Sequence, residues 1–174
     1  ALKRNDYPIP TIDDVLPLLK GAQFSTHLDA KNGFWHVVLD EESSYLTTFQ
    51  TPFGKYRWKR MPFGISPAPE EFQRRIDVAL AGLPGAVSVH DDIVFGKGAT
   101  EEEASSDHDA NFRRLLQTCR EKGIKLNRDK VEHKKKEVSY LGHVLTREGL
   151  KPDPKMIDAV RQLPVPADKQ AVHR

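Results

Sequence analysis

Two adjacent carboxylates, Asp91 and Asp92, are the residues of this sequence best suited to chemistry. They lie within 86–96, a run of strand-forming residues, and aspartate favours turns, so the pattern predicts a β-hairpin with both carboxylates at its tip. A third carboxylate, Asp29, ends another such run. Three converging carboxylates suit Mg²⁺, and two such ions about 3.5–4 Å apart stabilise the attacking and leaving oxygens of a phosphoryl transfer.

These carboxylates can cooperate only if the fold brings them together. Asp29 and Asp91 are 62 residues apart in the sequence, so they meet only if their strands are neighbours in one antiparallel sheet. Periodicity along the chain does not establish that contact. A solvated Asp-Asp turn therefore stays open as the alternative at this point.

The elements around the aspartates mix helices and strands without regular βαβ alternation, which predicts an α+β fold. Thr11 is expected to cap a first helix, kept short or kinked by Pro17. In the helix expected over 106–122, four residues are predicted to face inward: Phe112, Leu115, Leu116 and Cys119. The other expected elements are strands at 23–29, 34–39, 46–51, 55–58, 125–127 and 138–146, a helix capped by Ser66, and a last helix from Asp153.

Composition excludes some classes of protein and leaves others open. The single cysteine, Cys119, excludes an internal disulfide and a thiolate zinc cluster, and no apolar run approaches membrane-spanning length. The net charge is only +2, but basic residues crowd 113–136. That segment allows a phosphate-facing surface, and a solvated helix face is the equal alternative. The start at Ala1, without Met, predicts a segment cut from a longer polypeptide.

Five stretches follow one another along the chain: 24–34, 60–73, 89–92, 123–130 and 140–143. In this order they resemble the palm of a reverse transcriptase, most closely those of gypsy-type LTR retrotransposons. Residues 24–34 resemble the first catalytic motif, 60–73 the loop and helix behind the template, and 89–92 the aromatic-x-Asp-Asp motif. Residues 123–130 resemble the motif that follows, and 140–143 the primer-grip region.

This resemblance implies an RNA-directed DNA polymerase that adds dNTPs to a primer 3′-OH on an RNA or DNA template. Two Mg²⁺ ions, for which Mn²⁺ can substitute, would be held by a catalytic triad: Asp29, Asp91 and Asp92. The other implied contacts are to the dNTP (Ala30, Lys31, Asn32, Gly33 and Phe34), the templating base (Pro62, Phe63 and Gly64), the pyrophosphate (Lys130) and the primer (His90, Tyr140, Leu141 and Gly142).

Two of these roles have plain structural alternatives. Phe34 falls where a bulky ring would collide with a ribose 2′-OH, which would select dNTPs, but without the resemblance an ordinary core aromatic on a strand is the preferred interpretation. Lys130 is implied to be a mobile basic residue, but it also fits a solvated lysine in a basic run.

The match departs from the family at the Asp-Asp motif, where Val89 replaces an aromatic residue and His90 an apolar one. The resemblance implies that residues 1–174 form the palm and part of the fingers, without thumb, connection or RNase H regions. It also implies an intracellular location, in a cytoplasmic retroelement particle or the nucleus, with no membrane partner. Two rival hypotheses are a catalytically inactive, nucleic-acid-binding relic of a retroelement and a pure assembly role.

Overall fold

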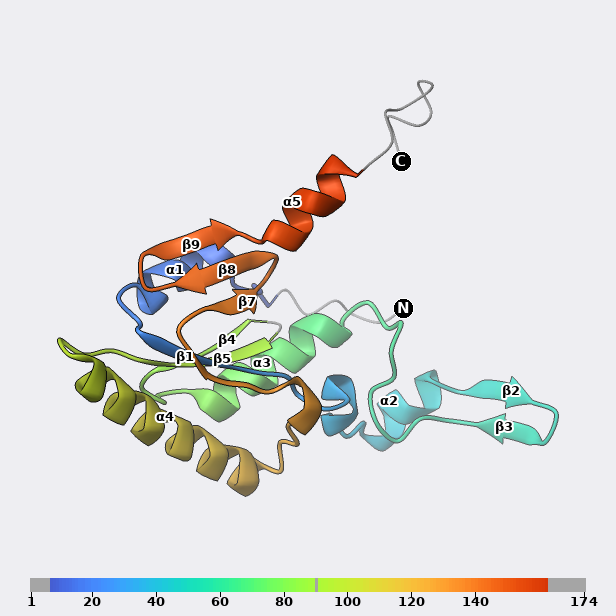
Figure 1. Ribbon diagram of the computed structural model, residues 1–174. Helices are drawn as coiled ribbons and strands as arrows, with labels where there is room; N and C mark the ends of the chain where they lie inside the picture. The colour runs from blue at the N-terminus through green and yellow to red at the C-terminus, as the bar shows by residue number, and fades with distance from the viewer. Residues whose placement is uncertain (1–6, 90, 163–174) are drawn as a thin grey trace.

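The computed structural model describes residues 7–89 and 91–162, of which 91–93 are described in backbone only. Its main sheet has four antiparallel strands in the order β4-β5-β1-β6 (Figure 1). The edge strand β4 (Ala86–Val89) and its neighbour β5 (Asp91–Gly96) form the hairpin predicted around the Asp-Asp pair. β1 (Phe24–Leu28) lies between β5 and β6 (Glu132–Lys135). The strands of Asp29 and Asp91 are therefore neighbours in one antiparallel sheet, as the metal-site hypothesis required.

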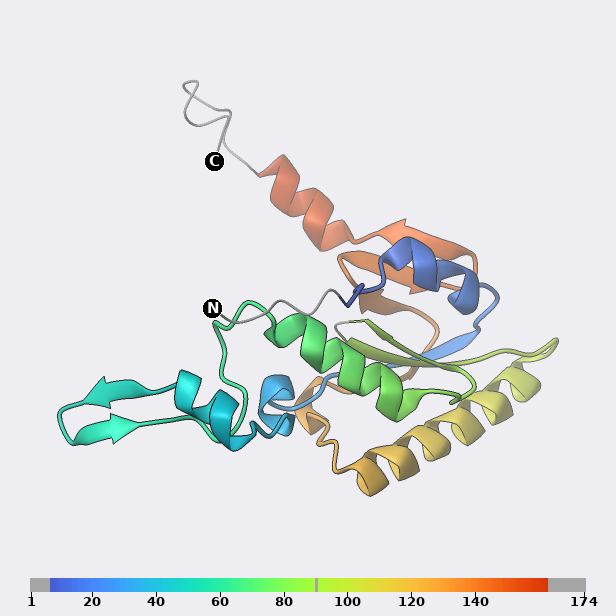
Figure 2. The same cartoon turned by 180° about the vertical axis from the view of Figure 1, so that it is seen from behind.

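Each face of the main sheet is covered by a separate core. Two helices, α3 (Ala68–Leu80) and α4 (Glu101–Lys122), pack on one face around Val94 and Leu115 (Figure 2). The other face holds α1 (Ile12–Leu19), which is short as Pro17 predicts. Beside α1 lies a second antiparallel sheet, made of β7 (Val138–Tyr140), β8 (His143–Thr146) and β9 (Gly149–Pro152). This mixture of helices and antiparallel sheets confirms the α+β prediction.

The strand predicted at 34–39 is wrong, because this segment begins with the 3₁₀ helix η1 (Gly33–His36). Asn32 adopts a left-handed conformation (φ 56°), which turns the chain back after β1, and the Trp35 amide donates to the Asn32 carbonyl. The next element is helix α2 (Glu41–Leu46), which was not predicted. Its start is stabilised by Asp40, whose carboxylate accepts a hydrogen bond from the Ser43 amide.

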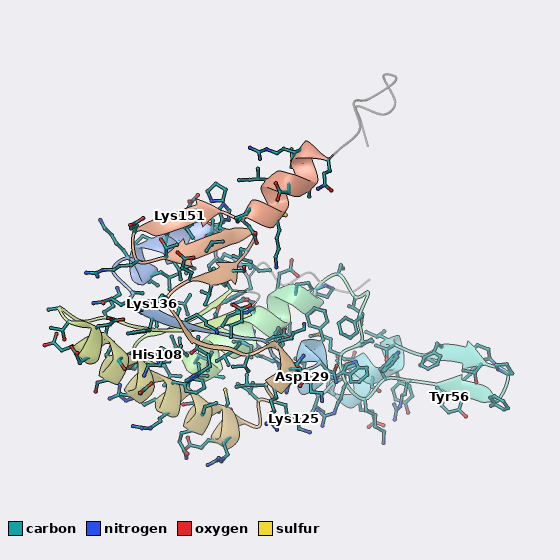
Figure 3. All side chains as sticks on the ribbon, in the orientation of Figure 1. Tyr56, His108, Lys125, Asp129, Lys136 and Lys151 are labelled. Atoms are coloured by element: carbon teal, nitrogen blue, oxygen red, sulfur yellow. The ribbon has the colours of Figure 1, made fainter. Side chains whose placement is uncertain are left out.

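The hairpin predicted beyond α2 forms over shorter strands, β2 (Phe49–Thr51) and β3 (Gly54–Tyr56). It extends away from the main body, and Tyr56 lies on it far from the main sheet (Figure 3). The hairpin makes no strand pairing with the main sheet, and its residues Phe49, Phe53 and Tyr56 are exposed.

Helix α4 begins earlier than predicted, because Thr100 and Glu103 form a capping box before the expected start at Ser106. The inward placement of Leu116 is also wrong, since this side chain is 40% exposed while Leu115 is fully buried. At α3 the N-cap is Pro67 rather than Ser66, and no side chain caps this helix end.

The C-terminal part is more finely divided than expected. The predicted strand 125–127 forms only an isolated bridge between Ala30 and Leu126, followed by the 3₁₀ helix η2 (Arg128–Lys130). The predicted strand 138–146 is split into β7 and β8 by a tight turn, and β6 and β9 were not predicted. Helix α5 (Pro154–Arg161) starts after Asp153 as expected. In the described part of the chain, no helix is long and apolar enough to cross a membrane.

Candidate active site

The sheet register brings the three aspartate positions to one end of the main sheet. Leu28, the last residue of β1, pairs with Asp92, and Val89 pairs with Asp91 across the hairpin. Extending the β1–β5 register by one residue sets Asp29 opposite Asp91. The side chains of Asp91 and Asp92, and the whole of His90, lie outside the described residues.

Asp29 is held in place by its backbone. Its carbonyl accepts from the Asn127 amide at 2.8 Å, and the Lys31 amide donates to the Lys125 carbonyl at 2.8 Å. These bonds align the segment after β1 with the segment that leads into η2. As a result Lys130, at the end of η2, places its Nζ 2.9 Å from Oδ2 of Asp29. The structure thus brings these two predicted site residues together across 101 positions of sequence.

A pocket of 290 Å³ opens beside the Asp29 carboxylate, whose side chain is 23% exposed. Five of its lining residues were predicted at the site: Asp29, Ala30, Gly33, Phe34 and Phe63. The other three were not predicted there: Pro69, Phe72 and Gln73. The ring of Phe34 lies 5.1 Å from that of Phe63 and 5.7 Å edge-on to that of Phe72. A Cβ on Gly33 would lie 2.9 Å from the Phe72 ring, so a larger residue here would displace that ring.

Not every predicted contact residue lines this pocket. Lys31 and Asn32 line a different pocket, on the opposite side of the loop that connects β1 to η1. Pro62 lines a third pocket of 410 Å³, together with Phe63, whose ring therefore borders two pockets. Gly64 follows with φ +84°, a conformation that favours glycine.

Two buried side chains from different elements hold the end of β4, next to the Asp-Asp pair. Gln73 of α3 donates from Nε2 to the Ser88 carbonyl at 2.8 Å and to Oδ1 of Asp77 at 2.9 Å. The Tyr140 hydroxyl donates to the Val89 carbonyl at 3.3 Å. The prediction did not single out Gln73. Its signal in the sequence is a polar residue at helical spacing from the buried Ile76 and Leu80.

The predicted primer contacts lie at the turn between β7 and β8. Tyr140 is 1% exposed, whereas Leu141 (φ 47°) and Gly142 (φ 76°) form a two-residue hairpin loop with both φ angles positive. A leucine in this left-handed region is strained, and Leu141 is retained there by packing against the core around α1. The Tyr140 hydrogen bond couples this turn to the β4–β5 hairpin.

The donor set at the sheet end suits a hard divalent cation. Asp29 supplies carboxylate oxygens, and the register sets two further aspartate positions beside it. Within the described side chains, no three His, Cys, Asp or Glu residues converge as a metal site, so the set depends on Asp91 and Asp92. The ion pair with Lys130 shows that a positive charge fits beside the Asp29 carboxylate.

Comparison with known proteins identifies a family. Residues 1–145 match the family model described as reverse transcriptase (RNA-dependent DNA polymerase). The Pol polyprotein of transposon 412 from Drosophila melanogaster is 35% identical over 174 residues, covering 99% of this chain and 14% of the polyprotein. The enzymatic polyprotein of cauliflower mosaic virus (strain Strasbourg) is 34% identical over 158 residues, covering 91% of this chain and 23% of that protein. The chain therefore spans less than a quarter of either relative.

Solved structures share the fold. A foamy viral protease-reverse transcriptase in complex with double-stranded DNA superposes with a TM-score of 0.88 at 22% identity, covering 99% of this chain and 30% of that one. The foamy viral protease-reverse transcriptase in complex with an RNA/DNA hybrid gives a TM-score of 0.76 at 22% identity, covering 91% and 21%. At this identity the likeness shows the fold alone.

Proposed function

Because the chain belongs to the reverse transcriptase (RNA-dependent DNA polymerase) family, we propose that it forms the catalytic core of an RNA-directed DNA polymerase. The observation that carries this proposal is the β1–β5 register, which pairs Leu28 with Asp92 and so sets Asp29 beside the Asp-Asp pair. The proposed reaction is attack of a primer 3′-OH on the α-phosphorus of a dNTP, with pyrophosphate as the leaving group.

The proposed roles follow from the positions of the residues. Asp29 and Asp91 hold two Mg²⁺ ions, for which Mn²⁺ can substitute, and Asp92 supports them. When bound, these ions stabilise charge on the attacking and leaving oxygens. Phe34, in the wall of the pocket beside Asp29, lies against the sugar of the dNTP. Lys130, 2.9 Å from the Asp29 carboxylate, is close enough to interact with the pyrophosphate.

The proposed binding partners, and the proposal that this chain is one part of a larger polymerase, rest on the relatives. Foamy viral neighbours bind double-stranded DNA and an RNA/DNA hybrid, which supports a template-primer as the partner of this chain, with dNTP as the substrate. We assign residues 1–174 to a palm with part of the fingers. The transposon relatives support a retroelement as the source. We further propose that this element is of the gypsy type and that the chain acts in an intracellular particle or the nucleus.

Primer extension tests the proposal directly. The chain is incubated with a primed RNA template, dNTPs and Mg²⁺ or Mn²⁺, beside an Asp91→Asn variant. We expect extension that the variant loses, because Asp91 is assigned as a metal ligand. Activity that persists in Asp91→Asn would exclude the triad assignment.

Direct metal binding gives a second readout that does not depend on turnover. Titration of the chain with Mn²⁺, followed by electron paramagnetic resonance, should show saturable binding. Asp29→Asn should weaken this binding by about tenfold or more, since it removes one of the proposed ligands. Equal affinity in the variant would contradict a role of Asp29 in holding the metal.

The second candidate function is a nucleic-acid-binding relic without turnover. The substitution of an aromatic residue by Val89 favours it, and Val89 is 1% exposed within the core that also holds Tyr140. This candidate predicts binding to a template-primer without extension under any divalent cation. Extension that depends on Asp91 would eliminate it.

A further inference from the structure

A second pocket lies on the other side of the loop that carries the proposed dNTP contacts. It has a volume of 280 Å³ and shares no lining residue with the pocket beside Asp29. The loop divides the two, since Ala30, Gly33 and Phe34 line one pocket while Lys31 and Asn32 line the other. The complete lining of the second pocket is Lys31, Asn32, Trp35, His36, Arg60, Gly123 and Lys125.

The charge on this lining has one sign. Three of the residues are cationic, Lys31, Arg60 and Lys125, and none is acidic. Among the described side chains, no ion pair involves any of these three, whereas Lys130 pairs with Asp29 and Lys134 with Asp109. A concave surface lined by uncompensated positive charge concentrates the field and attracts anions.

Hydrogen bonds fix the walls of the pocket before any ligand arrives. The Lys125 amide donates to Nε2 of His36 at 3.0 Å, so the proton of this neutral ring is on Nδ1, which donates to the Gly33 carbonyl at 2.9 Å. The Lys31 amide donates to the Lys125 carbonyl at 2.8 Å, and Nη1 of Arg60 donates to the Trp35 carbonyl at 2.8 Å. Figure 3 shows Lys125 close to η1, where these bonds meet. A preformed site loses less conformational freedom on binding.

We propose that this pocket is a phosphate-binding site, separate from the site of the substrate triphosphate. Lysine and arginine donors recognise phosphate oxygens by charge-assisted hydrogen bonds, and Arg60 adds a planar fork of donors. The phosphate belongs to the backbone of a nucleic-acid strand or to a free polyphosphate. The 41% exposed ring of Trp35 in the lining is available to a nucleobase next to that phosphate. The site needs neither metal nor turnover, so it goes beyond the proposed polymerase function.

Calorimetric titration of the full chain with inorganic pyrophosphate in EDTA, at constant ionic strength, tests the site. EDTA removes divalent ions, so binding through metals at the aspartates cannot contribute. We expect saturable binding that Arg60→Gln and Lys125→Gln each weaken by about tenfold, since each removes a charge-assisted contact. Both side chains are exposed, and thermal unfolding of each variant verifies that the fold is retained.

Two further variants separate this site from its neighbours. Lys135→Gln removes an exposed lysine on β6 and is the control that should leave pyrophosphate binding unchanged. Lys130→Gln removes the cation beside Asp29, so it measures how much of the binding takes place at that neighbouring site. Binding that never saturates, or that falls equally in Lys135→Gln, would overturn the proposal, as would a loss confined to Lys130→Gln.

Competition then identifies the source of the phosphate. A single-stranded oligonucleotide that displaces pyrophosphate, with an affinity that Arg60→Gln also lowers, assigns the pocket to a nucleic-acid backbone. Pyrophosphate binding that the oligonucleotide does not displace assigns it to a free polyphosphate. Either result supports the phosphate site, and neither depends on primer extension.

Discussion

At the scale of single residues, the Phe34 ring is held between two other rings. Its contacts with Phe63 and Phe72 fix it in the wall of the pocket beside Asp29. Phe34→Ala should raise the relative kcat/KM for rNTPs over dNTPs by about tenfold or more, because a ring that blocks the 2′-OH is lost. Primer extension with each nucleotide class measures this ratio. Phe34→Tyr keeps the ring and should keep the preference for dNTPs. An unchanged kcat/KM ratio in Phe34→Ala would show that Phe34 packs in the core and does not select the sugar.

His36 offers a second test at the residue scale, because its ring joins the loop after β1 to the segment before η2. It donates to the Gly33 carbonyl and accepts from the Lys125 amide. His36→Ala should lower the free energy of unfolding by about 1 kcal/mol, since both backbone groups lose a partner. His36→Gln can both donate and accept, so it should recover part of that loss. Urea unfolding compares the three proteins, and equal stability of all three would contradict the bridging role.

At the scale of elements, a buried histidine joins α4 to β1 and β6. His108 is fully buried, and its Nε2 lies 2.8 Å from the Thr26 hydroxyl, which also accepts from the Lys134 amide. The groups around the ring are Thr26, Asp109, Phe112, His133 and Lys134. Burial lowers the pKa of His108, and the adjacent Asp109 carboxylate opposes that shift only in part.

This shift predicts how stability depends on pH. Because the folded state lowers the pKa of His108, the unfolded chain binds more protons, and stability is lost as pH falls below about 6.5. His108→Gln should therefore have a flatter dependence of unfolding free energy on pH between about 7 and 5. Urea unfolding across this range measures the slope. The pKa of Asp109 is lowered, mainly by its hydrogen bond to Lys134, so this carboxylate stays ionised there and adds no slope. An identical slope in His108→Gln would exclude His108 as its source.

At the scale of the whole molecule, the main sheet is held between two cores, and Leu115 and Cys119 of α4 lie in the core around Val94. Leu115 is fully buried in that core, whereas its neighbour Leu116 is 40% exposed. Leu115→Ala should cost about 2–5 kcal/mol, because it removes buried methyl groups and leaves a cavity. Leu116→Ala should cost less than about 1 kcal/mol. Urea unfolding midpoints compare this matched pair, and equal losses would place α4 differently on the sheet.

Local patterns made several elements predictable. The hairpin of β4 and β5, the short α1 with its internal Pro17, and the start of α5 after Asp153 all follow from neighbouring residues. The errors arise where a local signal was misread or where partners are distant. Gly33–His36 is helical because Asn32 turns left-handed, and Leu116 was misplaced because helical spacing alone does not say how wide the buried stripe is.

The sequence by itself determined the family and singled out three aspartates as candidate metal ligands, because ordered motifs depend only on residue types and spacing. Only the tertiary structure decided that β1 and β5 are neighbours, that Lys130 reaches Asp29, and that the loop after β1 separates two pockets. These are contacts between residues far apart in the chain, and their register depends on hydrogen bonds and packing that no local pattern encodes.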